Sequence, residues 1–99
     1  MVPALDELKL QCRIEADWVE EDDLLLGYAY AARKRAENFI NRTLYDEVVP
    51  ENESQGLVIS ADIKLAIMLA VGYWYDNRTP TNLPAGFYSL LEPYRFIPL

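Results

Sequence analysis

The chain has 99 residues, a length that accommodates one domain with one modest hydrophobic core. Sixteen acidic against nine basic residues give a formal net charge of −7, which disfavours tight binding to nucleic acid because that binding requires a basic surface. An apolar fraction of 52% argues against an intrinsically disordered chain. The same acidic balance is ordinary for a soluble bacterial protein, so charge alone assigns no function.

The sequence offers little catalytic chemistry. It contains no histidine, so it lacks an imidazole base, and its one cysteine, Cys12, excludes a cysteine-rich zinc site. We interpret Cys12 as a small buried apolar residue. A chain with one cysteine is also typical of a protein made in a reducing, intracellular compartment. The longest apolar stretch, residues 63–75, is interrupted by Lys64 and is shorter than the roughly 20 residues of a membrane span. We predict a non-enzymatic protein with no cofactor, no metal and no membrane partner.

The first predicted helix covers residues 3–13. Pro3 suits the first helical position, because its missing N–H would have no partner there, and Asp6 and Glu7 favour the positive end of the helix dipole. One apolar face follows at helical spacing. Its members are Leu5, Leu8 and Cys12.

The second predicted helix covers residues 19–42, with Asp17 as its N-cap and Glu20 reaching back toward the cap. Gly27 and Ala31 form a small-residue patch, where we expect another helix to approach closely. The predicted inward stripe has helical spacing. It consists of Leu25, Ala29, Ala32, Ala36 and either Phe39 or Ile40.

Residues 43–59 read as a loop, in which residues 48–49 and 57–59 are candidates to pair as short extended segments. Ser60 then caps a third helix over residues 61–77, with Asp62 in its first turn. This helix is apolar nearly all round. Such a helix is either central to its domain or covered by another subunit, and in so small a domain we take it as a first indication of oligomerisation.

A short fourth helix is predicted over residues 84–91, followed by an apolar tail at residues 94–99. The tail has two interpretations, packing on its own domain or docking on a neighbour, because a free apolar tail lowers solubility. The predicted fold is all-α, one domain over residues 1–99, with three main helices in a compact bundle and a short C-terminal helix.

Three groups of residues are candidates for a site. The run 20–23 is acidic but lacks the spacing and the glycine of a calcium loop, so a solvated helix start is its simplest interpretation. The segments 72–78 and 83–95 combine aromatic residues with arginine, which is typical of interface anchors as well as of a core. The candidate subunit or portal interface consists of Trp74, Arg78, Phe87, Tyr94, Arg95, Phe96, Ile97 and Leu99.

Four stretches together resemble the small head–tail connector proteins of tailed phages and prophages, also called head-completion or DNA-packaging adaptor proteins. Two are the more specific: Asp62-Ile63-Lys64-Leu65-Ala66-Ile67 running into Tyr73-Trp74-Tyr75-Asp76-Asn77-Arg78, and Leu83-Pro84-Ala85-Gly86 with Leu90-Leu91-Glu92-Pro93-Tyr94-Arg95. The others are Leu5-Asp6-Glu7-Leu8-Lys9 with Arg13-Ile14, and the 24–44 helix with Asn41-Arg42-Thr43-Leu44. The chain departs from the family pattern in its short 79–82 loop and in Trp18.

The resemblance implies a subunit, made in the host cytoplasm, of a ring of about twelve copies at the virion head–tail junction. The ring docks on the portal protein, extends the DNA channel and presents a surface to the tail-side stopper, without catalysis or sequence-specific DNA binding. We add the hypothesis that an acidic channel wall keeps DNA mobile through like-charge repulsion. The candidate channel-facing acids are Glu20, Glu21, Asp22 and Asp23.

Two other classes stay open at this stage. The net charge is compatible with an acidic helical regulatory or inhibitor module that binds a basic host protein. A small carboxylate-based metal enzyme has only the 20–23 run in its favour.

Overall fold

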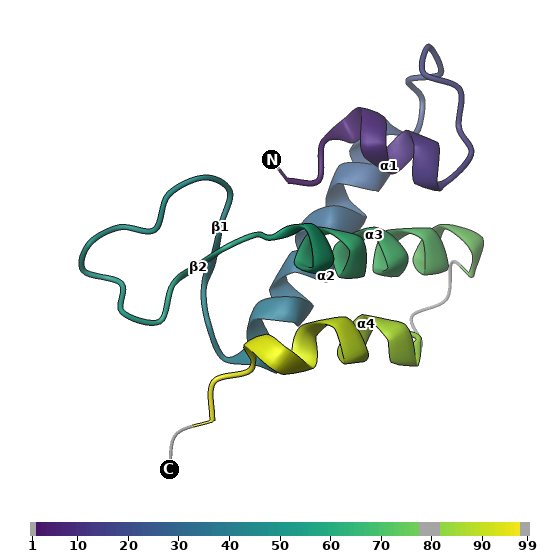
Figure 1. Ribbon diagram of the computed structural model, residues 1–99. Helices are drawn as coiled ribbons and strands as arrows, with labels where there is room; N and C mark the ends of the chain where they lie inside the picture. Colours follow the sequence, from purple (N-terminus) through teal and green to yellow (C-terminus); the bar gives the residue numbers. More distant parts are fainter. Residues whose placement is uncertain (1, 78–81, 98–99) are drawn as a thin grey trace.

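The computed structural model describes residues 2–77 and 82–97, and helices dominate it (Figure 1). This confirms the all-α fold class. The four helices are α1 (Leu5–Gln11), α2 (Asp22–Ile40), α3 (Ala61–Asp76) and α4 (Ala85–Leu91), and a single 3-10 turn, Glu92–Tyr94, follows α4. Two very short strands, β1 (Leu44–Tyr45) and β2 (Leu57–Val58), pair in parallel.

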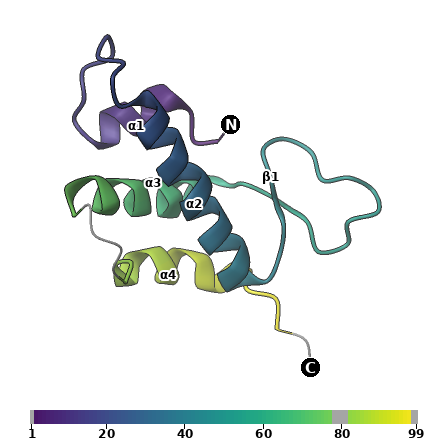
Figure 2. The ribbon, with the colours of Figure 1, turned by 180° about the vertical axis from the view of Figure 1, so that it is seen from behind.

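The helices form two layers with α3 in the middle. In Figures 1 and 2, α1, α3 and α4 lie side by side, and α2 crosses them on one side. All three of these other helices contact α3. The other helices of the same chain therefore cover most of the apolar surface of α3. That surface is weaker evidence for oligomerisation than the sequence indicated. Its exposed side keeps one large apolar residue, Leu65, which is 45% exposed.

The buried side of α2 is made mainly of alanines. Leu25, Ala29, Ala32, Ala36 and Ile40 are buried as predicted, and Phe39 is partly buried beside them. Small side chains allow two helix backbones to approach closely, and α3 presents Ala66 and Ala70 to the same core. The prediction that another helix approaches Gly27 and Ala31 was wrong for the helices of this chain. Both residues are exposed, and a Cβ atom added to Gly27 would have no neighbour within 4 Å.

The helix starts differ from the predictions at two places. Pro3 lies before α1, whose N-cap is Ala4, and Glu7 Oε1 accepts a 3.0 Å hydrogen bond from the Ala4 N–H. Asp17 does not cap α2, because α2 begins only at Asp22. The turns between them are set by local backbone hydrogen bonds, including one of 3.0 Å from the Trp18 N–H to the Glu15 carbonyl.

The end of α2 is set by Asn41, which has a left-handed backbone with φ of 58°. Asparagine is one of the few residues that adopt this conformation readily, so the helix ends at Ile40 and not at the predicted residue 42. The Phe96 N–H donates a 2.8 Å hydrogen bond to the Ile40 carbonyl. The C-terminal segment thus packs on its own domain as far as Phe96, while Ile97 is 59% exposed.

Residues 46–56 form a loop that extends away from the helices, and we call it the projecting loop (Figure 1). Its base is the β1–β2 pair, in which Leu44 is opposite Leu57. We predicted that residues 57–59 would pair with residues 48–49, and this pairing was therefore wrong. Leu44 takes that place because its side chain reaches the core and is 2% exposed, whereas Val48 is 74% exposed.

Within the described ranges, no helix is long and apolar enough to cross a bilayer.

The two glycines at positions 27 and 56 give a matched test of this fold. We expect Gly27→Ala to raise the free energy of unfolding by about 0.5–1 kcal/mol, because the site is exposed, helical and open. We expect Gly56→Ala to lower it by about 1 kcal/mol or more, because the added Cβ would lie 2.5 Å from Val49 Cγ1 and 2.9 Å from Tyr45 Cε2. Urea unfolding of both variants measures this, and equal shifts would contradict the loop packing.

Candidate interaction surfaces

The turn between α1 and α2 is organised by a buried lysine. Lys9 is 6% exposed, and its Nζ donates a 3.0 Å hydrogen bond to the Ala16 carbonyl. The same Nζ lies 3.0 Å from Asp22 Oδ1. A buried ammonium group needs such partners, so Lys9 holds the turn and the start of α2 against α1.

The four predicted channel-facing acids divide into two pairs. Asp22 is bound to Lys9, and Glu21 accepts a 2.8 Å hydrogen bond from the Tyr75 hydroxyl of α3. Glu20 and Asp23 are exposed. Only Glu20 and Asp23 therefore present their carboxylates fully to the surroundings, and the other two belong to the fold.

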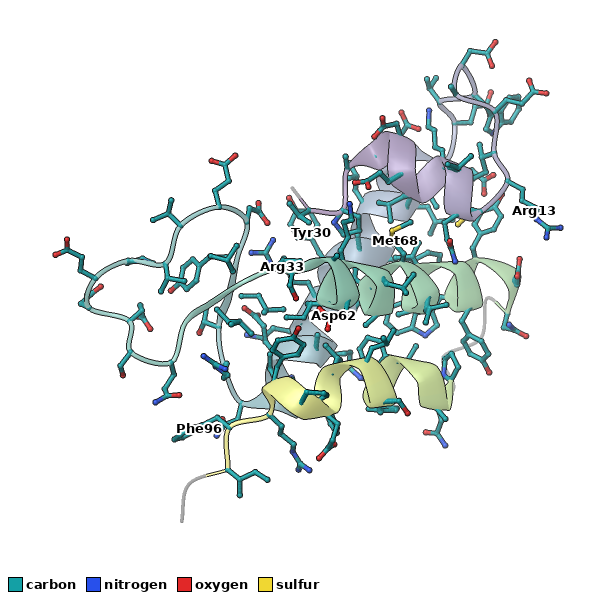
Figure 3. The ribbon with its side chains drawn as sticks, in the orientation of Figure 1. Arg13, Tyr30, Arg33, Asp62, Met68 and Phe96 are labelled. Carbon is teal, nitrogen blue, oxygen red and sulfur yellow. The ribbon has the colours of Figure 1, made fainter. Side chains whose placement is uncertain are left out.

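Two arginines of α2 and its end hold the projecting loop. Arg33 Nη1 lies 2.5 Å from Asp46 Oδ1, and its Nη2 donates a 2.7 Å hydrogen bond to the Leu44 carbonyl. Arg42 donates from Nε to the Gln55 carbonyl at 3.2 Å, on the returning side of the loop. Both sides of the loop base are therefore tied to the helix, so the loop leaves the domain in a defined direction (Figure 3).

The C-terminal turn is bound to the start of α3 through Asp62. The Tyr94 hydroxyl lies 2.7 Å from Asp62 Oδ1 and 2.6 Å from Oδ2, and Ser60 Oγ donates to Oδ1 at 2.5 Å. These hydrogen bonds, from Ser60 first and then Tyr94, lower the pKa of Asp62 from its usual 3.8. Ser60 occupies the N-cap position as predicted, but its hydroxyl binds Asp62 and does not cap the helix backbone.

The structure separates the candidate interface residues. Phe87 is fully buried, so it is a core residue and we withdraw it from the interface. Trp74 is half-buried, with its ring 5.9 Å from that of Tyr28. Arg95 lies over the Phe39 ring at 4.9 Å, and Tyr94 is half-buried on Asp62. Phe96 and Ile97 are 38% and 59% exposed. Arg78 and Leu99 lie outside the described residues.

Sequence reasoning predicted a loop over residues 43–59 but missed that it projects from the helices, and it missed several exposed apolar residues. Leu10 and Tyr30 are 80% and 61% exposed, on α1 and α2, and Val48 is the exposed apolar residue of the loop. One signal was available, because the sequence has no basic residue between Arg42 and Lys64 but four acids in residues 46–56. A stretch of one charge between two helices is typical of a solvated, projecting segment.

The surroundings of the Cys12 thiol do not activate it. Burial raises the pKa of Cys12 to about 11, with smaller contributions from Asp76 and Glu21, so the thiol stays protonated at neutral pH. Over residues 2–77 and 82–97, no three acidic or cysteine side chains gather in a way that would hold a metal ion.

Comparison with known proteins gives one match. The chain matches the family described as phage gp6-like head-tail connector protein over residues 3–95, nearly its whole length. No curated protein and no solved structure matches it.

The Asp62 cluster predicts a specific acid dependence. The pKa of Asp62 is lower in the folded than in the unfolded chain, so its contribution to stability is complete above the unfolded value near 3.8 and is lost as pH falls through the folded value. We expect Asp62→Asn to lower the free energy of unfolding by about 1 kcal/mol at pH 7, and by progressively less below pH ~4.

Urea unfolding between pH 7 and pH ~2 measures this difference, with the exposed Glu51→Gln as the control that shows little change. Parallel pH curves for wild type and Asp62→Asn would contradict the assignment.

Proposed function

This chain belongs to the phage gp6-like head–tail connector family, and from that membership we propose that its copies form a closed ring of about twelve subunits on the portal. Membership makes it a structural connector that works with phage head and tail proteins at the head–tail junction of the virion. The ring, the portal contact and the channel are our proposals. The family match over residues 3–95 is the observation that carries them.

The architecture supports a role in which the domain folds first and then associates. The core of the described residues is closed by the chain itself, with Leu8, Phe87 and Leu91 fully buried. Association therefore uses surfaces and does not require exchange of core elements. A closed ring uses two different surfaces of each subunit, one for each neighbour.

We place the portal contact at the C-terminal end. The backbone of Phe96 is anchored to Ile40, so the segment leaves the domain at a fixed point. Phe96 and Ile97 are exposed apolar residues at that point. Exposed apolar groups held on a rigid anchor suit a docking contact, because little conformational entropy is lost on binding.

We assign the channel-facing role to Glu20 and Asp23, the two members of the acidic run that are exposed. A carboxylate lining repels the phosphate backbone and gives DNA no site at which to stop. Glu21 and Asp22 support this surface indirectly through Tyr75 and Lys9.

Native mass spectrometry of the purified protein, alone and with isolated portal, tests the ring. We expect a closed species near twelve subunits, either in the free protein or on the portal. A variant that ends at Phe96 should fold but fail to bind the portal, and in the absence of portal it should assemble to the same extent as wild type. Tight dimers that do not bind the portal would contradict the proposal. Unimpaired portal binding by the shortened variant would show that the C-terminal segment does not make the portal contact.

A filter-binding assay with double-stranded DNA tests the channel acids. We expect wild-type rings to retain little DNA and rings of Glu20→Lys with Asp23→Lys to retain at least about tenfold more at low salt, with steep loss as salt rises. Asp76→Lys with Glu92→Lys is the control, since it changes the charge equally at other exposed sites. Equal DNA retention by both variants would contradict the assignment to the channel.

A further inference from the structure

The outer face of α2 is basic although the chain is strongly acidic. In Figure 2 this helix is nearest the viewer, and no other helix covers that side. Beyond its first turn, the exposed residues of α2 include no acid. They are Gly27, Tyr30, Ala31, Lys34, Arg35 and Asn38.

Two charged residues that lie between these positions, Arg33 and Glu37, form their hydrogen bonds within the chain. Arg33 binds Asp46 and the Leu44 carbonyl, and Glu37 Oε2 accepts a 2.8 Å hydrogen bond from the Leu44 N–H. Beyond the first turn, Lys34 and Arg35 are therefore the charges that α2 offers to a partner. Tyr30, 61% exposed, supplies an aromatic surface about one helical turn before them.

The C-terminal end of this face has a hollow of about 340 Å³. It is lined by Lys34, Asn38, Asn41 and Arg42, together with Glu37, Thr43 and Gln55. The Arg42 guanidinium already donates to the carbonyls of Gln55, Gly56 and Tyr94, so the polar character of the hollow toward a partner rests on Lys34 and the two asparagines. Ammonium, guanidinium and carboxamide groups are the usual partners of a carboxylate. The face is therefore suited to an acidic segment with an apolar residue beside it.

The projecting loop has this chemistry. Glu47, Glu51 and Glu53 are exposed, Val48 is 74% exposed, and no basic residue lies between Arg42 and Lys64. Arg33 and Arg42 fix the loop base, and Gly56 lies close to the side chains of Tyr45 and Val49. Such anchors reduce the conformational entropy that the loop would lose on meeting a partner. The loop also extends beyond the helices, as contact with another copy requires (Figures 1 and 2).

We propose that the projecting loop of one copy docks on the outer face of α2 of the next copy, with Glu51 and Glu53 near Lys34 and Arg35 and Val48 near Tyr30. The two surfaces are different, so the contact is heterologous and each subunit uses one surface toward each neighbour, as ring closure demands. This inference rests on the ring of the proposed function and names the contact that closes it. The charge pairs select the register and speed the encounter.

Two charge-reversal variants test the pairing by native mass spectrometry, with and without portal. The loop variant is Glu51→Lys with Glu53→Lys, and the face variant is Lys34→Glu with Arg35→Glu. Each alone places like charges at every contact, so we expect the ring population to fall at least about tenfold at the concentration where wild type is half assembled. Circular dichroism checks that both variants keep their helices.

Restoration is the decisive result. An equimolar mixture of the two variants should form rings in which they alternate, because each contact then joins opposite charges. A single chain carrying all four substitutions should also form rings, and it has the native net charge. Glu15→Lys with Asp17→Lys, which matches the charge change of the loop variant at exposed sites elsewhere, should assemble like wild type.

The outcomes separate this inference from the ring itself. If wild type and both variants form rings equally, the pairing is overturned and the ring stands. If both variants fail and neither the mixture nor the combined chain restores assembly, the pairing is overturned as well. If wild type forms no ring even on the portal, the proposed function fails and this contact fails with it.

Discussion

The contact between α2 and α3 uses small side chains, and the rest of the domain is arranged around it. Ala29, Ala32 and Ala36 line the buried side of α2, and α3 brings Ala66 and Ala70 into the same core. Alanines bring the two backbones close but fill little volume, so larger residues must complete the core, some from α2 and α3 themselves, such as Ile63 and Ile67, and some from the other helices. Leu8 of α1 and Phe87 and Leu91 of α4 do this, and all three are fully buried.

Polar anchors then fix the segments that are not helical. Lys9 holds the turn before α2, Arg33 and Arg42 hold the projecting loop, and Asp62 holds the C-terminal turn. Three of these anchors are basic residues, and their charges are therefore used within the fold. The exposed bases that remain are few, and Lys34 and Arg35 stand next to each other on α2. A net charge of −7 thus coexists with one distinctly basic face.

The helices could be predicted from the sequence because their apolar spacing depends only on local periodicity. The stripe from Leu25 to Ile40 is a case in which that signal was sufficient. For α3 the apolar pattern left two interpretations open, a central helix or one covered by another subunit, and its contacts with the other helices favour the first. The start of α2 was not predictable in this way. Asp17 has the right side chain for a cap. However, Lys9 of the preceding helix binds both the Ala16 carbonyl and Asp22, and the helix begins only at Asp22. Contacts of this kind are tertiary, and a local pattern does not contain them.

The candidate surfaces show the same limit. Trp74, Phe87 and Phe96 are all aromatic residues near the C-terminal half, yet one is half-buried, one fully buried and one partly exposed. Composition identifies residues suited to an interface, and only packing decides which of them reach the surface. The acids Glu20 to Asp23 divide for the same reason, since α1 and α3 supply partners for the middle two.

The proposed ring contact is built mainly from charge, and this fits a domain that already closes its own core. With such a contact, a free subunit does not need to expose a large apolar patch before assembly, and this lowers its tendency to aggregate. Exposed charge pairs are individually weak and are screened by salt, so a single contact of this kind holds two free copies only loosely. A portal that binds several copies side by side raises their effective concentration, and contacts that are weak in solution then become sufficient. On this argument the same loop and helix face would favour assembly at the portal over assembly elsewhere in the cell.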